Sequence, residues 1–248
     1  MAAPPKSDGK FPTTEWTLVA RLRNDDVEVS ARALDDLCAQ YHFPLYAFIR
    51  QRGLTHHDAQ DTLHDFLAKL LRNNVFSDLA EEKGRLRTLL AKSLQRFLIN
   101  RHHKESQRAS NEMSLDEERF HLDSKLKQRY ERELGSSTDA PDVNFDRQWC
   151  AQLLNRVMQR LKAAYLGKKE IVFTTLQPVL ISGGSLRGHD APELAARLSI
   201  SEGALRSSLL RLLRDYRRLL VDEVRQTVDS KEEVQAEIAH LMSVMARK

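Results

Sequence analysis

Residues 192–206 constrain the fold more than any other stretch, because their pattern joins two helices through a tight polar turn. The first helix is short and apolar, and the second is rich in arginine. The apolar positions that can form a small core shared by both helices are Ala195, Leu198, Ile200 and Leu205. Ser201 is a natural N-cap for the second helix, since its hydroxyl can accept a hydrogen bond from a first-turn amide. This spacing predicts a helix-turn-helix.

The second helix of this segment is cationic on one side. Its arginines are Arg206, Arg211, Arg214, Arg217 and Arg218, with Asp215 as the only acid among them. A helix that is apolar on one side and cationic on the other suits the major groove of DNA. Arg206 faces away from the apolar side and could reach a guanine edge. Part of the charge also complements the dipole at the end of the helix.

The rest of the chain is patterned for helices as well. No convincing run of alternating β-branched residues indicates a strand, and the 248 residues include only 9 Gly and 7 Pro. With 41% hydrophobic and 30% charged residues, the chain can build one large or two small domains. The predicted fold is therefore all-α.

We expect two helical domains joined by a linker. The first domain spans residues 13–108, and the acidic stretch 109–145 predicts a partly ordered linker. Residues 146–228 contain the helix-turn-helix, and residues 229–248 predict a terminal amphipathic helix. That helix is expected to pack on the second domain, or else to dock a regulator. Its apolar positions are Val234, Ile238, Leu241, Met242 and Met245.

An acidic helix follows Gly53 in the first domain. Thr55 and Asp58 resemble a capping box at its start. At about 100° per residue, one side gathers the apolar residues Ala59, Leu63, Phe66, Leu67 and Leu70. The opposite side gathers Asp58, Asp61 and Asp65, whose like charges repel. The pattern fits a docking surface for a basic partner, and it also fits a solvated face.

A basic helix follows, expected over residues 84–103. From Lys83 to Arg108 the cationic residues are Lys83, Arg85, Arg87, Lys92, Arg96, Arg101, Lys104 and Arg108. Only Glu105 opposes them, although the net charge of the whole chain is a modest +4. Charge concentrated in this way is typical of nucleic-acid binding.

The residue patterns do not favour catalysis or a cofactor. His57 with Asp61, and Asp61 with His64, have helical ligand spacing, but a di-iron bundle needs Glu-x-x-His on further helices. The sequence contains no phosphate loop and no nucleophile elbow. Cys38 and Cys150 do not form a CxxC pair, which argues against a zinc ribbon. We expect no metal, no cofactor and no enzyme activity, with a metal-dependent helical enzyme as the remaining alternative of that class.

The expected location is the cytoplasm. No stretch approaches the roughly 18 apolar residues of a membrane span, and the polar first ten residues lack the core of a signal peptide.

An acidic helix, a basic helix, a linker and a helix-turn-helix, in that order, resemble a bacterial RNA polymerase sigma factor of the extracytoplasmic-function group. The residues that carry the resemblance are 11–16, 41–53, 58–61, 65–66, 83–88 and 201–204. The similarity covers nearly the whole chain. The segment Asp-Ala-Gln-Asp at 58–61 is fairly specific in this context, whereas a helix-turn-helix alone is generic.

The resemblance implies roles for three groups of residues. Docking on the clamp helices of the polymerase beta-prime subunit would involve Asp58, Asp61, His64 and Asp65. Contact with the downstream promoter element and the opened strand would involve Arg85, Arg87, Lys92, Arg96, Asn100 and Arg101. Reading of the double-stranded upstream element would involve Ser201, Arg206, Ser207, Leu210, Arg211 and Arg214. The linker would thread the polymerase cleft.

The chain departs from the family pattern at two positions of the helix-turn-helix. Ser199 replaces the glycine that is typical of the turn, at a modest cost in strain. Leu210 replaces a polar residue on the reading face, where it could contact a thymine methyl or another protein.

The predicted function is therefore a transcription initiation factor that binds core RNA polymerase and promoter DNA. An anti-sigma factor or a kinase is the kind of regulator the resemblance implies. The alternative is a helix-turn-helix regulator that needs no polymerase, in which the first domain serves dimerisation or ligand sensing.

Overall fold

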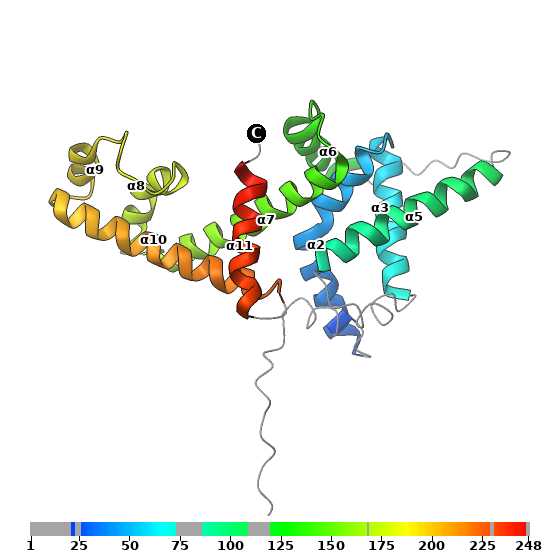
Figure 1. The fold of residues 1–248 in the computed structure, drawn as a ribbon, viewed down its shortest axis with the longest axis horizontal. Coiled ribbons are helices and arrows are strands. Elements are labelled where there is room, and N and C mark those ends of the chain that lie inside the picture. Colours follow the sequence, from blue (N-terminus) through cyan, green and yellow to red (C-terminus); the bar gives the residue numbers. More distant parts are fainter. Residues whose placement is uncertain are drawn as a thin grey trace, which may run out of the picture. The chain divides into compact units, whose positions relative to one another are not determined.

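The computed structural model describes residues 21–22, 26–72, 86–108, 120–167, 169–228 and 231–246. These residues form α-helices and their connections, without a strand among them, so the all-α prediction is confirmed (Figure 1). The helices are α2 (Val27–Arg50), α3 (His56–Arg72), α5 (Leu86–Arg108), α6 (Phe120–Leu134), α7 (Pro141–Ala164), α8 (Glu170–Ile181), α9 (Ala191–Arg197), α10 (Glu202–Arg225) and α11 (Lys231–Ala246). Within the described ranges, no helix combines the length and the apolar character needed to cross a membrane.

The chain divides into two compact units. The first unit comprises the described residues up to Cys150 together with those from Gln226 onward. The second unit is Ala151–Arg225. The division falls inside α7, whereas the expected linker 109–145 contains α6 and the first turn of α7. The expectation that α11 packs on the second unit is wrong, because α11 belongs to the first.

Helix α2 lies at the centre of the first unit. Asp26 starts the helix by accepting hydrogen bonds from the amides of Glu28 and Val29. The C-terminal part of α2, residues 43–49, is buried on all sides. The chain leaves the helix at Gly53, whose φ of +90° favours glycine. A helix surrounded in this way must be covered by several neighbours.

Helix α3 packs on α2 through the predicted apolar stripe. All five of its predicted apolar residues are buried, namely Ala59, Leu63, Phe66, Leu67 and Leu70. Helix α5 adds Leu86, Leu90 and Leu94 to the buried residues of this unit. Phe145 on α7 meets Phe48 edge-on, with the ring centroids 6.3 Å apart. These contacts leave the acidic side of α3 facing outward.

The second unit has a core shared by α8, α9, α10 and the end of α7. Its most buried residues are Leu161, Tyr165, Phe173, Leu176, Val179, Ala195, Leu205, Leu209 and Leu212. Gly184, with φ +74°, is in the connection between α8 and α9. The positive φ favours glycine at this position, and a Cβ atom there would also lie 2.7 Å from Leu213 Cδ2, so the leucine side chain would have to shift.

Candidate functional site

Helices α9 and α10 form the predicted helix-turn-helix. The amide of Ala204 donates to Ser201 Oγ at 3.2 Å, so the N-cap predicted for α10 is confirmed. Asp190 caps α9, accepting from the amide of Glu193 at 2.9 Å. Between the helices, Ser199 has φ +54°, and the amide of Ile200 donates to the carbonyl of Ala195 at 3.1 Å. The turn therefore imposes the left-handed backbone for which glycine is the usual residue.

The two helices pack as the pattern predicted. Ala195 and Leu205 are buried, and Leu198 and Ile200 are half-buried against the same core. Asp215, the acid among the arginines of α10, accepts a hydrogen bond from Tyr165 Oη at 3.0 Å. Burial, followed by this hydrogen bond, raises the pKa of Tyr165 to about 12, so the hydroxyl remains a donor at neutral pH. Asp215 thus helps to hold α10 in place.

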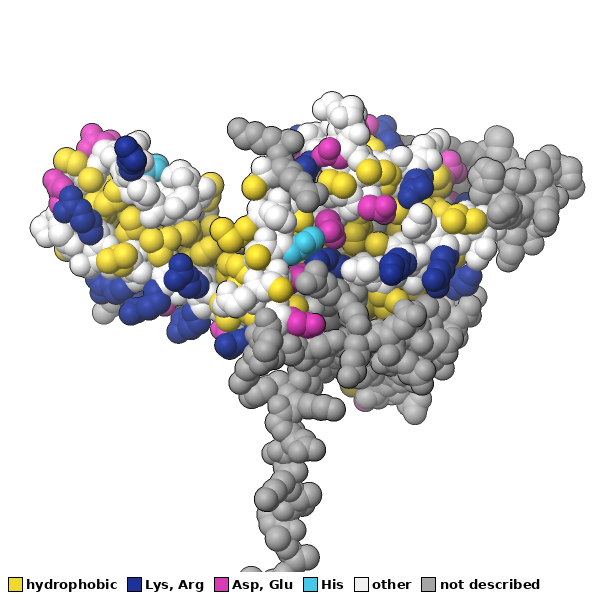
Figure 2. Space-filling model, viewed as in Figure 1, with side chains coloured by type: hydrophobic (Ala, Val, Ile, Leu, Met, Phe, Trp, Pro, Cys, Tyr) yellow, Lys and Arg dark blue, Asp and Glu magenta, His cyan; other side chains and the backbone are white. Residues whose placement is uncertain are grey.

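The opposite side of α10 is exposed and cationic. Its exposed residues include Arg206, Ser207, Leu210, Arg211, Arg214, Arg217 and Arg218. Leu205, Leu209 and Leu212 are buried on the other side of the helix. Figure 2 shows Lys and Arg side chains gathered along the edge of this unit where Figure 1 draws α10. A straight helix with this face outward can enter a major groove.

The contacts that the exposed residues of α10 make along the helix are weak. Arg206 pairs with Glu202 at 3.1 Å, and both side chains are largely exposed. An exposed pair of this kind contributes about 0.3–0.5 kcal/mol, whereas a bidentate contact with guanine contributes about 1–3 kcal/mol. Arg206 can therefore exchange Glu202 for a base. Leu210 is 67% exposed, which is unusual for leucine in the middle of a helix.

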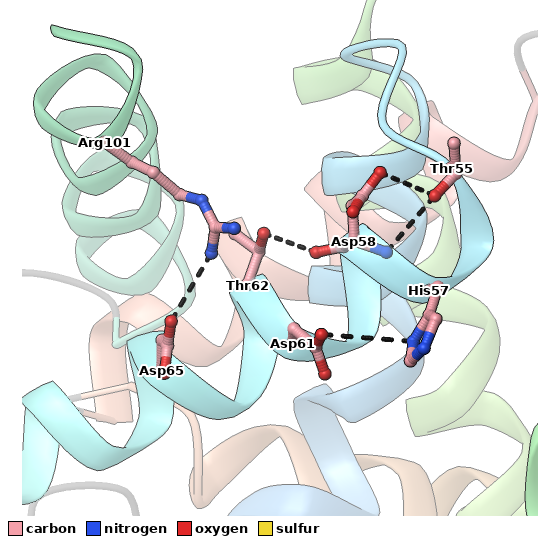
Figure 3. A network of polar contacts seen from close by, with 7 residues as sticks. All are labelled: Thr55, His57, Asp58, Asp61, Thr62, Asp65 and Arg101. Atoms are coloured by element: carbon pink, nitrogen blue, oxygen red, sulfur yellow. Dashed lines mark hydrogen bonds and ion pairs between the residues drawn. The ribbon is translucent and has the colours of Figure 1, made fainter. Parts of the chain in front are cut away.

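The acidic side of α3 is drawn in Figure 3. Thr55 Oγ1 donates to Asp58 Oδ2 at 2.6 Å and accepts from the amide of Asp58 at 3.2 Å. Thr55 therefore caps α3 as predicted, with Asp58 accepting from the Thr55 hydroxyl, whereas in a full capping box the carboxylate accepts from the backbone amide of the cap. Asp58 serves the start of the helix, and its negative charge also complements the helix dipole there.

The other two aspartates of α3 face different partners. Asp61 Oδ2 lies 3.9 Å from His57 Nδ1, and Asp65 Oδ2 lies 3.4 Å from Arg101 Nη1 on α5 (Figure 3). Both aspartate side chains remain more than half exposed. His64 is exposed as well. Asp61 has the least committed carboxylate of the three, because its contact with His57 lies at the outer limit of an ion pair.

The basic residues of α5 separate into two groups. Lys92, Arg96 and Asn100 are exposed and recur every fourth residue, so they form one outward stripe. Arg101 contacts Asp65, and Arg85 lies outside the described residues. Among the side chains of α5 that the structure describes, the exposed cations are therefore Lys92 and Arg96.

Arg87 is the clearest departure from the expected site. Its side chain is only 4% exposed and forms ion pairs with Glu237 on α11 and with Asp146 on α7, the latter at 3.4 Å. Its guanidinium lies 4.4 Å from the ring centroid of Trp149. The expected contact of Arg87 with DNA therefore needs correction, because buried partners satisfy this cation in the core of the first unit.

The sequence reasoning missed the residues that surround Arg87. Glu237 is fully buried, and His240 Nε2 lies 3.3 Å from Asp146 Oδ2. One feature of the sequence could have indicated that Glu237 is buried, since this residue falls in the stripe formed by Val234, Leu241 and Val244. A carboxylate at such a position requires a buried cation.

Both cysteines have a raised thiol pKa. Burial raises the pKa of Cys38, and it raises the pKa of Cys150 to about 12. Both thiols therefore stay protonated at neutral pH. Among the residues that the structure describes, no cluster of three or more His, Cys, Asp or Glu side chains could hold a metal ion.

Comparison with known proteins returned no match to a protein-family model, to a curated protein or to a solved structure.

Proposed function

We propose that this protein is a sigma-like transcription initiation factor, which binds core RNA polymerase and directs it to promoter DNA without catalysing a reaction. The observation that carries the proposal is the exposed cationic face of α10, held outward by a capped helix-turn-helix. In this role the protein works in the cytoplasm, where an anti-sigma factor or a kinase is the expected kind of regulator.

The DNA contact of the second unit is supported by the arrangement of charge on α10. Arg206 lies near the N-terminus of the helix, where a recognition helix contacts bases. Arg211 and Arg214 lie further along the same exposed face and suit phosphate contacts. Phosphate contacts supply affinity and register, whereas base contacts supply sequence preference. We assign Arg206 to base reading and the later arginines to phosphates.

A second DNA contact is proposed for the first unit. The outward stripe of Lys92, Arg96 and Asn100 on α5 offers cations and an amide to an opened strand. Arg85 remains part of this proposal, and Arg87 is removed from it because it is buried in an ion-pair network. A cationic groove or stripe that follows the backbone is the usual basis of single-strand binding.

The polymerase contact is proposed for the acidic side of α3, by way of Asp58, Asp61, His64 and Asp65. These residues share one exposed side of the helix. Their mutual repulsion is reduced when a basic partner approaches, which favours docking. Asp61 is the residue on which we expect docking to depend most, since Asp58 also caps the helix and Asp65 also contacts Arg101.

The same contacts support a second candidate, a DNA-binding regulator that needs no polymerase. In that case the acidic residues of α3 serve only the helix cap at Asp58 and the ion pair at Asp65, and α3 binds no partner protein. The first unit would then serve dimerisation or ligand sensing.

Charge reversal at Asp61 distinguishes the two candidates. Asp61→Lys should abolish co-elution with core polymerase while leaving the helical content and the thermal midpoint of unfolding unchanged. Asp35→Lys is the matched control, because Asp35 is an exposed carboxylate on α2 of the same unit. Equal polymerase binding by Asp61→Lys and wild type would contradict docking through α3.

A further inference from the structure

Helix α11 presents a charged residue to the core of the first unit. Its buried side chains are Val234, Glu237, Leu241 and Val244, which recur at three- and four-residue intervals along one stripe. Two apolar residues expected on that stripe, Met242 and Met245, are instead exposed. Glu237 is fully buried in the middle of the stripe.

The partners of Glu237 come from helices far away in the sequence. Arg87 on α5 pairs with Glu237 and, through Nε, with Asp146 Oδ1 on α7 at 3.4 Å. His240 on α11 approaches the other oxygen of Asp146 at 3.3 Å. Trp149 on α7 covers the guanidinium. A buried pair of this kind specifies one register of its helices, because a shifted helix would leave a charge unpaired.

The position of α11 in the chain gives these contacts a second consequence. Along the sequence, the second unit (Ala151–Arg225) follows the part of α7 that contacts Arg87 and precedes α11. It therefore connects to the first unit at both ends. On the C-terminal side, Thr227 and Val228 are already buried before α11 begins. A unit with two attachments can sample fewer separations from its neighbour than a unit on one linker.

We infer that α11 is a latch that restricts the separation between the two DNA-contacting surfaces, and so sets which promoter spacings the protein accepts. This inference rests on the proposed function. Glu237 and Leu241 act as positioning residues, because they hold α11 on the first unit without touching DNA. Each added base pair moves one promoter element by about 3.4 Å along the duplex. A series of templates with different spacer lengths therefore measures the range of separations between the two DNA-contacting surfaces that the protein allows.

Two variants release the latch by different physical means. Glu237→Gln keeps the shape of the side chain and removes the charge that pairs with Arg87. Leu241→Ala removes apolar contact from the same stripe and leaves every charge in place. Glu233→Gln is the matched control, because it replaces the same side chain by the same amide at an exposed position of α11.

The experiment measures run-off transcription from templates whose two promoter elements are separated by a series of spacer lengths. Hydrogen exchange of the α11 amides is recorded on the same full-length proteins. Wild type and Glu233→Gln should lose about tenfold in product when the spacer departs from the optimum by two base pairs, whereas Glu237→Gln and Leu241→Ala should lose only about threefold. Both of these variants should show faster exchange in α11 and unchanged exchange in α3 and α10.

Each outcome decides the inference. Faster exchange in α11 with a broadened spacing range supports it. Faster exchange in α11 with an unchanged range of accepted spacer lengths overturns the inference and leaves the proposed function in place. Unchanged exchange in both variants has the same consequence. If wild type yields no promoter-dependent product at any spacing, the proposed function fails and the latch fails with it.

Discussion

Helices α5 and α10 are both rich in cations, and their arginines have different surroundings. On α10, Arg206, Arg211 and Arg214 are exposed on the side away from the core. On α5, Arg87 lies in the core between two carboxylates and an indole ring. Helical periodicity separates an apolar from a charged side clearly on α10 and only weakly on α5. On α5 the neighbours that the helix acquires on folding therefore decide which of its cations stay exposed. A cluster of arginines in the sequence is therefore evidence for DNA binding only after its buried members are removed.

The largest effect that tests this comparison is on stability. Arg87→Ala leaves Glu237 and Asp146 without their cation, and breaking a buried pair in this way costs about 3–5 kcal/mol. Arg96→Ala, on the exposed stripe of the same helix, should change the free energy of unfolding by less than about 0.5 kcal/mol. Urea denaturation of both variants measures the difference. Equal losses would show that Arg87 is not a core residue.

The next effect is on DNA recognition by α10. Arg206→Ala should weaken binding at a preferred site, selected from random duplexes, by about 1–3 kcal/mol and leave binding to other sequences nearly unchanged. Arg214→Ala should weaken binding to all sequences and reduce the salt dependence by about one ion. Fluorescence anisotropy over a range of salt concentrations measures both. A uniform loss in Arg206→Ala would contradict its assignment to a base.

A smaller effect is expected at the turn of the helix-turn-helix. Ser201→Ala removes the acceptor for the amide of Ala204, and loss of an N-cap costs about 1 kcal/mol of stability. Ser207→Ala is the control, because Ser207 bonds a carbonyl within the helix and caps nothing. Thermal unfolding followed by circular dichroism compares them. If Ser207→Ala destabilises the protein more than Ser201→Ala, the cap is not what starts α10.

The smallest effect concerns pH. Burial, and then the nearby His64, lower the pKa of His42 below its ordinary value of 6.5. The unfolded chain therefore takes up a proton at His42 at a higher pH than the folded protein does. Its contribution to stability is complete above about pH 6.5 and is lost as the pH falls toward the folded pKa.

His42→Gln should consequently flatten the decline in the free energy of unfolding between about pH 7 and 5. A slope that is unchanged in His42→Gln would exclude this histidine as a cause of acid sensitivity.

Local features were predictable from the sequence. The cap formed by Thr55 and Asp58, the N-cap at Ser201 and the apolar stripe of α3 each depend on residues of a single helix and its cap. Such patterns are set by helix geometry alone. The turn at Ser199 was also predictable, because a helix-turn-helix requires a left-handed residue there.

Long-range features were not predictable in the same way. Arg87 and Glu237 are 150 positions apart, and neither local pattern indicates that the other residue will lie beside it. The buried stripe of α11 consists of Val234, Glu237, Leu241 and Val244. Met242 and Met245, which the pattern placed on the apolar side, are therefore exposed. The contact between Arg87 and Glu237 also removes Arg87 from the exposed cations of α5. The cap, the turn and the exposed face of α10 were predictable because its core is local, whereas the burial of Arg87 on α5 was not.

We propose that the acidic and cationic surfaces serve one purpose, promoter-dependent initiation. The most direct measurement is run-off transcription from promoters enriched by the purified complex, using core polymerase with and without this protein. The account predicts a discrete product that requires the protein and disappears with Asp61→Lys. A discrete product that is equally abundant without the protein, or its absence with core polymerase of proven activity, would contradict the account.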